Sequence, residues 1–248
     1  MKITLRGERI TRRFPMGRVY FEALRGIDLT VEKGEFVAVM GPSGCGKSTL
    51  LHILGGLDRP TSGRVMIEGT DITQLSERAL TLLRREKTGF VFQAFNLIPT
   101  LTAYENVALP LLIAGKSISK NADRLTDIIT LMHLVTVQDH RPDQLSAGEQ
   151  QRVAIARSLL PNPSILLADE PTGNLDYTTG LEVMDLLWHS CIRLEQTIVL
   201  ASHDAQAAAF ADRVLVLRDG MIQEEILLGR REEHSAGPLI AQLQRLGL

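Results

Sequence analysis

The segment GPSGCGKST, residues 41–49, follows a short apolar run, EFVAVMG (35–41), and opens a helical pattern, KSTLLHILGGL (47–57). Its form, G-x-x-x-x-G-K-[ST] between a strand and a helix, is typical of a phosphate-binding loop, whose backbone N–H groups point inward at the start of a helix. In such a loop Lys47 reaches the β- and γ-phosphates of a nucleotide, and the Ser48 hydroxyl binds Mg²⁺. We therefore predict a nucleotide site made of Gly41, Pro42, Ser43, Gly44, Cys45, Gly46, Lys47, Ser48 and Thr49.

A second apolar run, ILLADEP (165–171), ends in two adjacent carboxylates. α/β proteins bind ligands at the carboxyl ends of their strands, which is where Asp169 and Glu170 are expected to lie. Such a pair is usually a solvated turn or a helix cap, but beside a phosphate-binding loop we assign Asp169 to the Mg²⁺ shell. Glu170 is then the general base that polarises the attacking water. The chain has no guanine-specifying N-K-x-D motif, which argues against a GTPase.

Strand-like and helical patterns alternate through most of the chain, which predicts an α/β fold with a predominantly parallel sheet. Residues 1–36 predict an antiparallel β subdomain, with ITLRGERITRRF and ALRGIDLTVEKGEF as strands separated by MGRVYFE. Between about 94 and 160 the pattern becomes helical, and we predict a helical subdomain there. We expect one main domain over 1–228 and a short tail, 229–248, with a mobile segment and an amphipathic helix, PLIAQLQRL.

Composition excludes several classes of protein. The chain has 248 residues, of which 44% are hydrophobic and 23% charged, so it is neither disordered nor fibrous and can bury a large core. Its net charge of −2 gives no sign of a nucleic-acid partner. No apolar stretch approaches the ~18 residues of a membrane span, and the N-terminus does not resemble a signal peptide. Cys45 and Cys191 lie too far apart in the sequence to suggest a metal site or a disulfide framework. We expect a cytosolic protein with reduced thiols.

The motif LSAGEQQRVAIARSLL (145–160) lies shortly before the Asp-Glu strand. Together with GPSGCGKST and ILLADEP, it resembles the ATPase subunit of ABC transporters, and the resemblance extends from the first strand to about Glu225. It implies a P-loop NTPase fold with a helical subdomain that carries this signature motif. It also implies ATP and Mg²⁺ as cofactors, and ATP hydrolysis coupled to transport.

The resemblance further assigns roles to single residues. The aromatic side chain that stacks on adenine matches Phe14, in RRFPMG, with Tyr20 as a weaker candidate. The glutamine that senses Mg²⁺ and water matches Gln93, in FVFQ, and the switch histidine at the γ-phosphate matches His203, in ASHD. The signature motif matches Leu145, Ser146, Ala147, Gly148 and Glu149, and the D-loop matches Asn174, Leu175 and Asp176.

The signature motif offers a second anion site, because Ser146 and the N–H groups of Ala147 and Gly148 open a predicted helix. One chain thus carries two phosphate-binding ends, which in the family face each other across a head-to-tail dimer with ATP between them. The commonest family signature is LSGGQ, so Ala147 and Glu149 are departures. If residue 147 needs a positive φ or a close approach to the γ-phosphate, its Cβ weakens the site by about 1 kcal/mol.

The segments FVFQAFNLIPTLTAYENVALPL (90–111), HRPDQLSAGEQQRVAIARSLL (140–160) and DEPTGNLD (169–176) are most similar to the LolD/MacB-type group. This implies a permease partner with few transmembrane helices and a large external domain, a second copy of the chain, and a peripheral place at the cytoplasmic face of the membrane. Mechanotransmission would then drive export or extraction of a lipoprotein, lipid, peptide or drug, with the substrate set by the partner.

Two alternatives remain open at this stage. One is an FtsE-like regulator without a transported substrate, which shares the ATPase chemistry. The other is a soluble ABC ATPase of translation or DNA repair. That class usually has two cassettes or a long coiled coil and binds nucleic acid, whereas this chain has one cassette and a near-neutral charge.

Two local features add expectations. The segment that follows Gln93 is unusually apolar, and we expect Phe95, Leu97, Leu101 and Tyr104 to line a groove for a helix of the permease. Cys45 lies beside Lys47 and a helix N-terminus, which predicts a lowered thiol pKa and a reactive thiolate.

Overall fold

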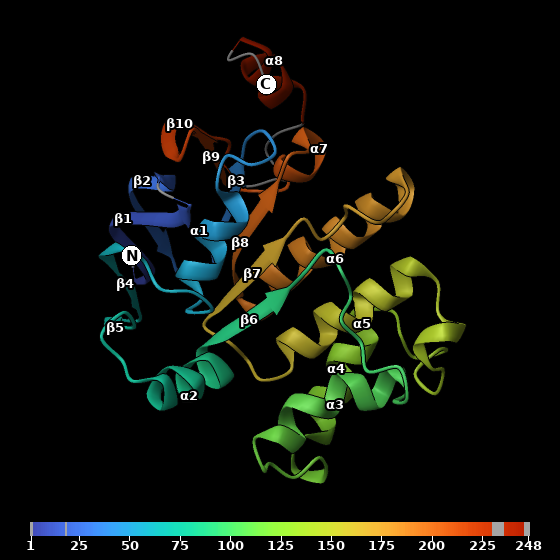
Figure 1. Ribbon diagram of the computed structural model, residues 1–248. Coiled ribbons are helices and arrows are strands. Elements are labelled where there is room, and N and C mark those ends of the chain that lie inside the picture. The colour runs from blue at the N-terminus through green and yellow to red at the C-terminus, as the bar shows by residue number, and fades with distance from the viewer. Residues whose placement is uncertain (1, 18, 230–235, 246–248) are drawn as a thin grey trace.

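The computed structural model describes residues 2–17, 19–229 and 236–245. Its larger sheet has the order β10-β9-β3-β8-β7-β6 (Figure 1). β10 pairs antiparallel with β9, and the pairs β9–β3, β3–β8, β8–β7 and β7–β6 are parallel. The strands are β3 (Phe36–Met40), β6 (Thr88–Val91), β7 (Ile165–Asp169), β8 (Thr197–Ser202), β9 (Arg213–Arg218) and β10 (Met221–Leu227). β3 and β8 are buried throughout, as expected of parallel strands covered on both faces.

A smaller antiparallel sheet precedes and flanks the phosphate-binding loop, with the order β2-β1-β4-β5. Its strands are β1 (Ile3–Met16), β2 (Val19–Glu32), β4 (Ser62–Ile67) and β5 (Thr70–Asp71). The prediction that MGRVYFE separates the two strands is wrong, because β1 extends to Met16 and β2 begins at Val19. The β-branched and aromatic residues at 19–21 favour an extended backbone. Gly17, directly after the end of β1, has a positive φ of 64°, which glycine adopts without strain.

Eight α-helices are described, and three of them lie between β6 and β7, together with two short 3-10 helices, Ser119–Asn121 and Pro142–Gln144. Their bounds are α1 (Lys47–Leu54), α2 (Glu77–Lys87), α3 (Ala103–Ile113), α4 (Ala122–Leu131), α5 (Ala147–Leu159), α6 (Tyr177–Leu194), α7 (Ala205–Ala208) and α8 (Ala236–Arg245). One hydrophobic cluster joins Val107 of α3, Ile128 of α4 and Val153 of α5 to Leu200 of β8. The helical segment therefore shares its core with the sheet. Among the described residues, no helix is long and apolar enough to cross a membrane.

The C-terminal helix α8 returns to the body of the protein beside α7 (Figure 1). Leu239 is fully buried in the main hydrophobic cluster, and the Gln242 amide donates a hydrogen bond of 2.9 Å to Glu224 of β10. The mobile segment predicted before this helix falls mainly on residues 230–235, which lie outside the described residues.

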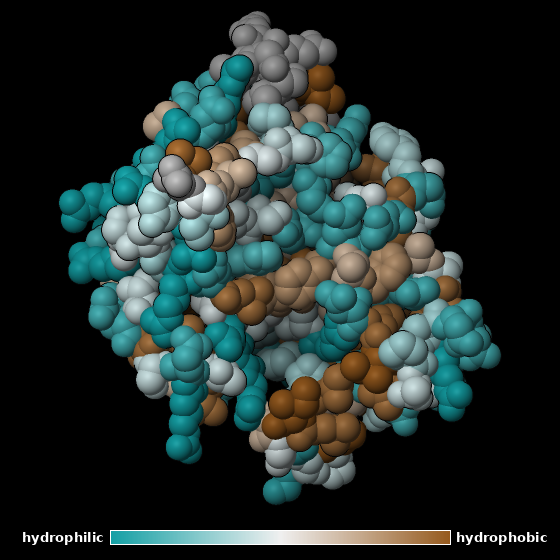
Figure 2. All heavy atoms as spheres, viewed as in Figure 1, coloured by the Kyte–Doolittle hydropathy of each residue, from teal (hydrophilic) through white to brown (hydrophobic). Residues whose placement is uncertain are grey.

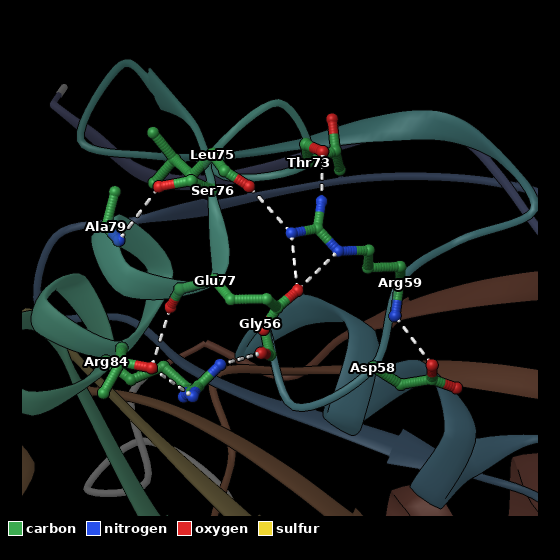
Figure 3. A network of polar contacts seen from close by, with 10 residues as sticks. Gly56, Asp58, Arg59, Thr73, Leu75, Ser76, Glu77, Ala79 and Arg84 are labelled. Atoms are coloured by element: carbon green, nitrogen blue, oxygen red, sulfur yellow. Dashed lines mark hydrogen bonds and ion pairs between the residues drawn. The ribbon is translucent and has the colours of Figure 1, made fainter.

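Helix α2 was not predicted, because its sequence, ERALTLLRREK, is mostly charged and buries only Leu80. Its position depends on polar contacts (Figure 3). Ser76 caps its N-terminus, and the Arg59 guanidinium donates to the carbonyls of Thr73 and Leu75, at 2.8 and 2.7 Å, and to the Glu77 carboxylate at 2.8 Å. Arg84 donates to the carbonyl of Gly56 at 2.7 Å. These bonds join α2 to the segment that follows α1.

We expect Arg59→Met to lower the free energy of unfolding by about 2 kcal/mol, because two backbone carbonyls and a carboxylate lose a charged donor. Urea unfolding measures the loss as a lower midpoint at unchanged slope. The matched control is Arg64→Met, which removes only an exposed pair with Glu8 and should cost less than about 1 kcal/mol. Equal losses in the two variants would contradict the role given to Arg59.

Candidate active site

Three adjacent strands of the larger sheet end at the same edge. The register places Met40 of β3 opposite Ser202 of β8, and Asp169 of β7 opposite Ala201 of β8. The loop 41–46, His203 and Glu170 follow directly from these strand ends. The strand order thus brings together segments that lie more than a hundred residues apart in the sequence.

The loop after β3 surrounds the Lys47 ammonium group. Lys47 is buried, and its Nζ donates to the carbonyls of Gly41 at 2.8 Å and Pro42 at 3.2 Å. Gly46 has a φ of 110°, and a Cβ on it would lie 2.6 Å from the carbonyl oxygen of Ala23. A cavity of about 360 Å³ opens beside this loop, and its lining includes Ser43, Gly44, Gly46, Lys47, Ser48 and Thr49.

Asp169 and Ser48 meet beside the loop, where the Ser48 hydroxyl donates to Oδ1 of Asp169 at 2.9 Å. Burial raises the pKa of Asp169, and the hydrogen bond from Ser48 opposes that shift. A hydroxyl beside a carboxylate is a donor set that suits Mg²⁺, which prefers oxygen ligands. Sequence analysis missed His52, whose Nε2 lies 3.9 Å from Oδ2 of Asp169. Its position one helical turn after Ser48 was the available signal.

Glu170 turns the backbone directly after β7 with a φ of 47°, in the left-handed region that non-glycine residues rarely adopt. Its Oε1 lies 3.7 Å from Nζ of Lys47, and its Oε2 lies 2.9 Å from Nδ1 of His203. Backbone strain of this kind costs about 1–3 kcal/mol and is concentrated at functional sites. The predicted catalytic residues Glu170 and His203 are therefore in contact, with Lys47 adjacent.

Gln93 is placed differently from the other predicted residues. Its side-chain amide donates to Oδ1 of Asn174 at 3.3 Å, and the Asn174 amide donates back to the Gln93 carbonyl at 3.0 Å. A Cβ on Gly173 would lie 2.7 Å from Nε2 of Gln93. The structure therefore ties Gln93 to the predicted D-loop, and its contact with Mg²⁺ stays a prediction.

Aromatic side chains line the other end of the cavity. Phe14 is among the lining residues and Tyr20 is not, which favours Phe14 as the adenine platform. The guanidinium of Arg12 lies 4.6 Å from the centre of the Phe14 ring. Phe21 also lines the cavity and was missed, although strand alternation opposite Phe14 could have indicated it.

The signature residues begin α5 and do not line this cavity. Ser146 and Glu149 form a capping box, with the Ser146 N–H and hydroxyl donating to the Glu149 carboxylate at 2.8 and 2.7 Å. The hydrogen bonds from Ser146 hold the pKa of Glu149 below its ordinary value. Ala147 is the first helical residue and has no positive φ, so the expected backbone strain is absent. The close approach to a γ-phosphate stays a prediction.

Two further residues of these motifs have structural roles that the sequence did not indicate. A Cβ on Gly148 would lie 2.4 Å from Cγ2 of Thr179, so glycine permits the close packing of α5 on α6. Asp176 caps α6 by accepting a hydrogen bond from the Thr179 N–H at 3.1 Å. Hydrogen bonds from the Thr179 side chain and then from its N–H lower the pKa of Asp176.

Comparison with known proteins places these residues in a family. The family described as ABC transporter matches residues 24–173. An ABC transporter ATP-binding protein of Thermotoga maritima is 47% identical over 85% of this chain and 89% of its own length. The chain belongs to the ABC transporter ATPase family. A macrolide export ATP-binding/permease protein, MacB, of Rhodopseudomonas palustris is 45% identical over 95% of this chain, which spans 36% of that longer protein.

Solved structures of ABC ATPases share the fold as well as the sequence. The ATP-binding cassette MJ0796, in a dimeric post-hydrolysis state bound to ADP and Pi, has a TM-score of 0.82 and 43% identity. The match covers 90% of this chain and 98% of that one. The cbiO1 subunit from Clostridium perfringens, part of the transporter complex cbiONQ, has a TM-score of 0.84 and 28% identity over the whole chain. The expected fold class and ATPase activity are confirmed.

The apolar segment after Gln93 only partly fits the expected groove of this ABC ATPase. Leu97 and Tyr104 pack against the main hydrophobic cluster and so belong to the core. Ile98 is 41% exposed, and the buried Asn106 side chain bonds both its N–H and its carbonyl. Further along, Figure 2 shows apolar side chains gathered over α3, which ends in the exposed Leu112 and Ile113.

The expected lowering of the Cys45 thiol pKa is wrong. Its side chain is buried, and burial raises the pKa of the thiol more than nearby Lys47 lowers it. The thiol also does not line the cavity beside Lys47, but faces an adjoining one with Asp219 and Gly220.

We expect the Cys45 thiol to react more slowly in the folded chain than in the unfolded one, because the thiolate is the reactive form and burial disfavours it. Labelling of the Cys191→Ser variant with a chromogenic disulfide at pH 7.5, with and without urea, measures both rates. The double variant Cys45→Ser/Cys191→Ser has no cysteine and reports the background reaction. If Cys45 were labelled faster in the folded chain than in the unfolded one, this prediction would be contradicted and an activated thiolate supported.

Proposed function

We propose that this ABC ATPase hydrolyses ATP at the edge formed by β3, β7 and β8, with Glu170 polarising the attacking water. The supporting observation is the position of Glu170, whose carboxylate lies between the Lys47 ammonium and the His203 ring. A carboxylate held there accepts a proton from water as the oxygen attacks the γ-phosphorus. Lys47 neutralises charge on the β- and γ-phosphates, and His203 orients Glu170 and contacts the γ-phosphate.

We propose Mg²⁺ as the metal of this reaction, held by Ser48 and Asp169 with Gln93 nearby. When bound, the ion would neutralise charge on the β- and γ-phosphate oxygens. The Ser48–Asp169 hydrogen bond keeps the two oxygen ligands adjacent, and Phe14 supports the adenine ring at the far end of the cavity. Asp176 and its D-loop neighbours would complete the site from beside Gln93.

A second copy of the chain is part of the proposal. The cavity of one chain contains no signature residue, although Ser146, Ala147, Gly148 and Glu149 begin a helix whose N–H groups favour an anion. In a head-to-tail dimer, α5 of the partner would cover the γ-phosphate. The relative MJ0796 is dimeric with ADP and Pi bound, which supports this arrangement.

We propose that the dimer drives a separate permease with few transmembrane helices and a large external domain, as in the LolD/MacB-type group. The support is the likeness to MacB, whose name combines ATP-binding and permease functions in one longer protein. This chain would then be peripheral, at the cytoplasmic face of the membrane. An extracted lipoprotein, lipid, peptide or drug is the cargo class that the branch favours.

Glu170→Gln should keep ATP binding, because Lys47, Ser48 and Asp169 are unchanged. It should lower hydrolysis by roughly 10²–10⁴, the contribution of a positioned general base. With hydrolysis blocked, Mg-ATP should convert the monomer into a dimer in sedimentation, and ADP should not. The matched control Glu182→Gln, at an exposed position of α6, should hydrolyse ATP as the native chain does. Full turnover by Glu170→Gln would remove Glu170 from the proposed role.

Ile98→Asp should prevent the permease from co-purifying with the tagged chain in detergent, because it places a charge at an exposed apolar position in the segment that follows Gln93. ATP hydrolysis by the isolated chain should be unchanged, since Ile98 does not line the cavity. Val135→Asp, at another exposed apolar position of the helical segment, is the matched control. If Ile98→Asp retains the permease as well as Val135→Asp does, the docking surface lies elsewhere.

A further inference from the structure

The aromatic end of the nucleotide cavity contains a residue with no assigned role. Phe21 lies directly opposite Phe14 in the β1–β2 pair, and in an antiparallel pair such residues project from the same face of the sheet. Both side chains line the cavity that contains Lys47 and Ser48. Phe21 is nevertheless 46% exposed, an unusual state for a phenylalanine that packs only within its own chain.

Arg12 restricts how a base can use Phe14. Its guanidinium lies 4.6 Å from the centre of the Phe14 ring and is held by an ion pair of 2.8 Å with Asp58. One face of the Phe14 ring is therefore covered. A base that stacks on the other face needs a further surface to shield it from water.

Phe21 is positioned to supply that surface. It also lines the adjoining cavity of about 150 Å³, together with Pro42, Gly44 and Asp219. Phe21 is thus one of four residues that line both cavities, and it has the largest side chain among them. Beyond Lys47 and Glu170 at the phosphate end, the lining side chains carry no charge.

From these contacts we infer that Phe21 is a second base-contacting residue, which with Phe14 forms a two-ring platform for the purine of the bound nucleotide. The inference rests on the proposed nucleotide site. Stacking uses the face of the base and not its hydrogen-bonding edge, so the platform holds adenine and guanine alike. Tyr20, which is next to Phe21 and projects from the other face of β2, has no part in it.

The test measures dissociation constants by calorimetry for three Mg²⁺-bound ligands: the β,γ-imido analogues of ATP and GTP, and inorganic tripolyphosphate. Phe21→Ala should weaken both nucleotide analogues by about fivefold or more, the usual effect of losing a stacked aromatic ring. Tripolyphosphate, which has no base, should bind as it does to the native chain. Phe21→Trp should restore nucleotide affinity, and Tyr20→Ala should leave it unchanged.

Several results would overturn the inference. One is unaltered nucleotide affinity in Phe21→Ala, and another is an equal loss for tripolyphosphate, which would mean that the loop itself is disturbed. A loss confined to Tyr20→Ala would move the platform to the other face of the hairpin. Failure of the native chain to bind any of the three ligands would instead overturn the proposed nucleotide site, so the two failures are distinguishable.

Discussion

The left-handed turn at Glu170 is the constraint on which the catalytic edge depends. A strand that continued past Asp169 would carry the next side chain away from the phosphate-binding loop. Instead the backbone turns at Glu170, whose carbonyl accepts a hydrogen bond from the Gly173 N–H at 3.0 Å. The carboxylate therefore lies against both Lys47, from the loop after β3, and His203, from the end of β8. The stability of the buried parallel strands offsets the strain of the turn.

The same edge explains why the acidic pair divides its work. Asp169 is still part of β7, is half-buried, and accepts a hydrogen bond from Ser48 of α1. Glu170 lies beyond the strand and contacts the lysine and the histidine. One step along the backbone thus directs one carboxylate to the Ser48 hydroxyl and the next to Lys47 and His203, which agrees with the separate roles proposed for them.

Sequence patterns were sufficient where one segment carries its own signal. The loop 41–49, the buried strands and the start of a helix at Ser146 are local, and their geometry follows from residue type and spacing. Helix α2 was missed because its stability depends on Arg59 and Arg84, which reach carbonyls of a distant loop. The strand at residues 19–21 was missed for a related reason. These residues are extended because they pair with β1, and the local sequence does not show that pairing.

The burial of individual side chains was also not predictable from local sequence patterns. Cys45 has a lysine and a helix N-terminus as sequence neighbours, yet the loop turns its thiol away from solvent, and desolvation outweighs the nearby charge. Leu97 and Tyr104 belong to an apolar segment that suggested a partner surface, but both side chains pack against the hydrophobic core of their own chain. In each case the residue type was interpreted correctly, but the degree of burial of its side chain was not predicted.

The capping box shows how Glu149 can occupy the first turn of a helix that is proposed to bind an anion at its N-terminus. A carboxylate beside an incoming phosphate would repel it if the charge were free. Here the N–H and the hydroxyl of Ser146 both donate to that carboxylate, and it lies in the first turn of α5, where the helix dipole favours negative charge. The charge is therefore compensated within the turn, as the proposed contact of the Ala147 and Gly148 N–H groups with a phosphate requires. This compensation makes a glutamate compatible with the anion site proposed for the nucleotide of a second chain.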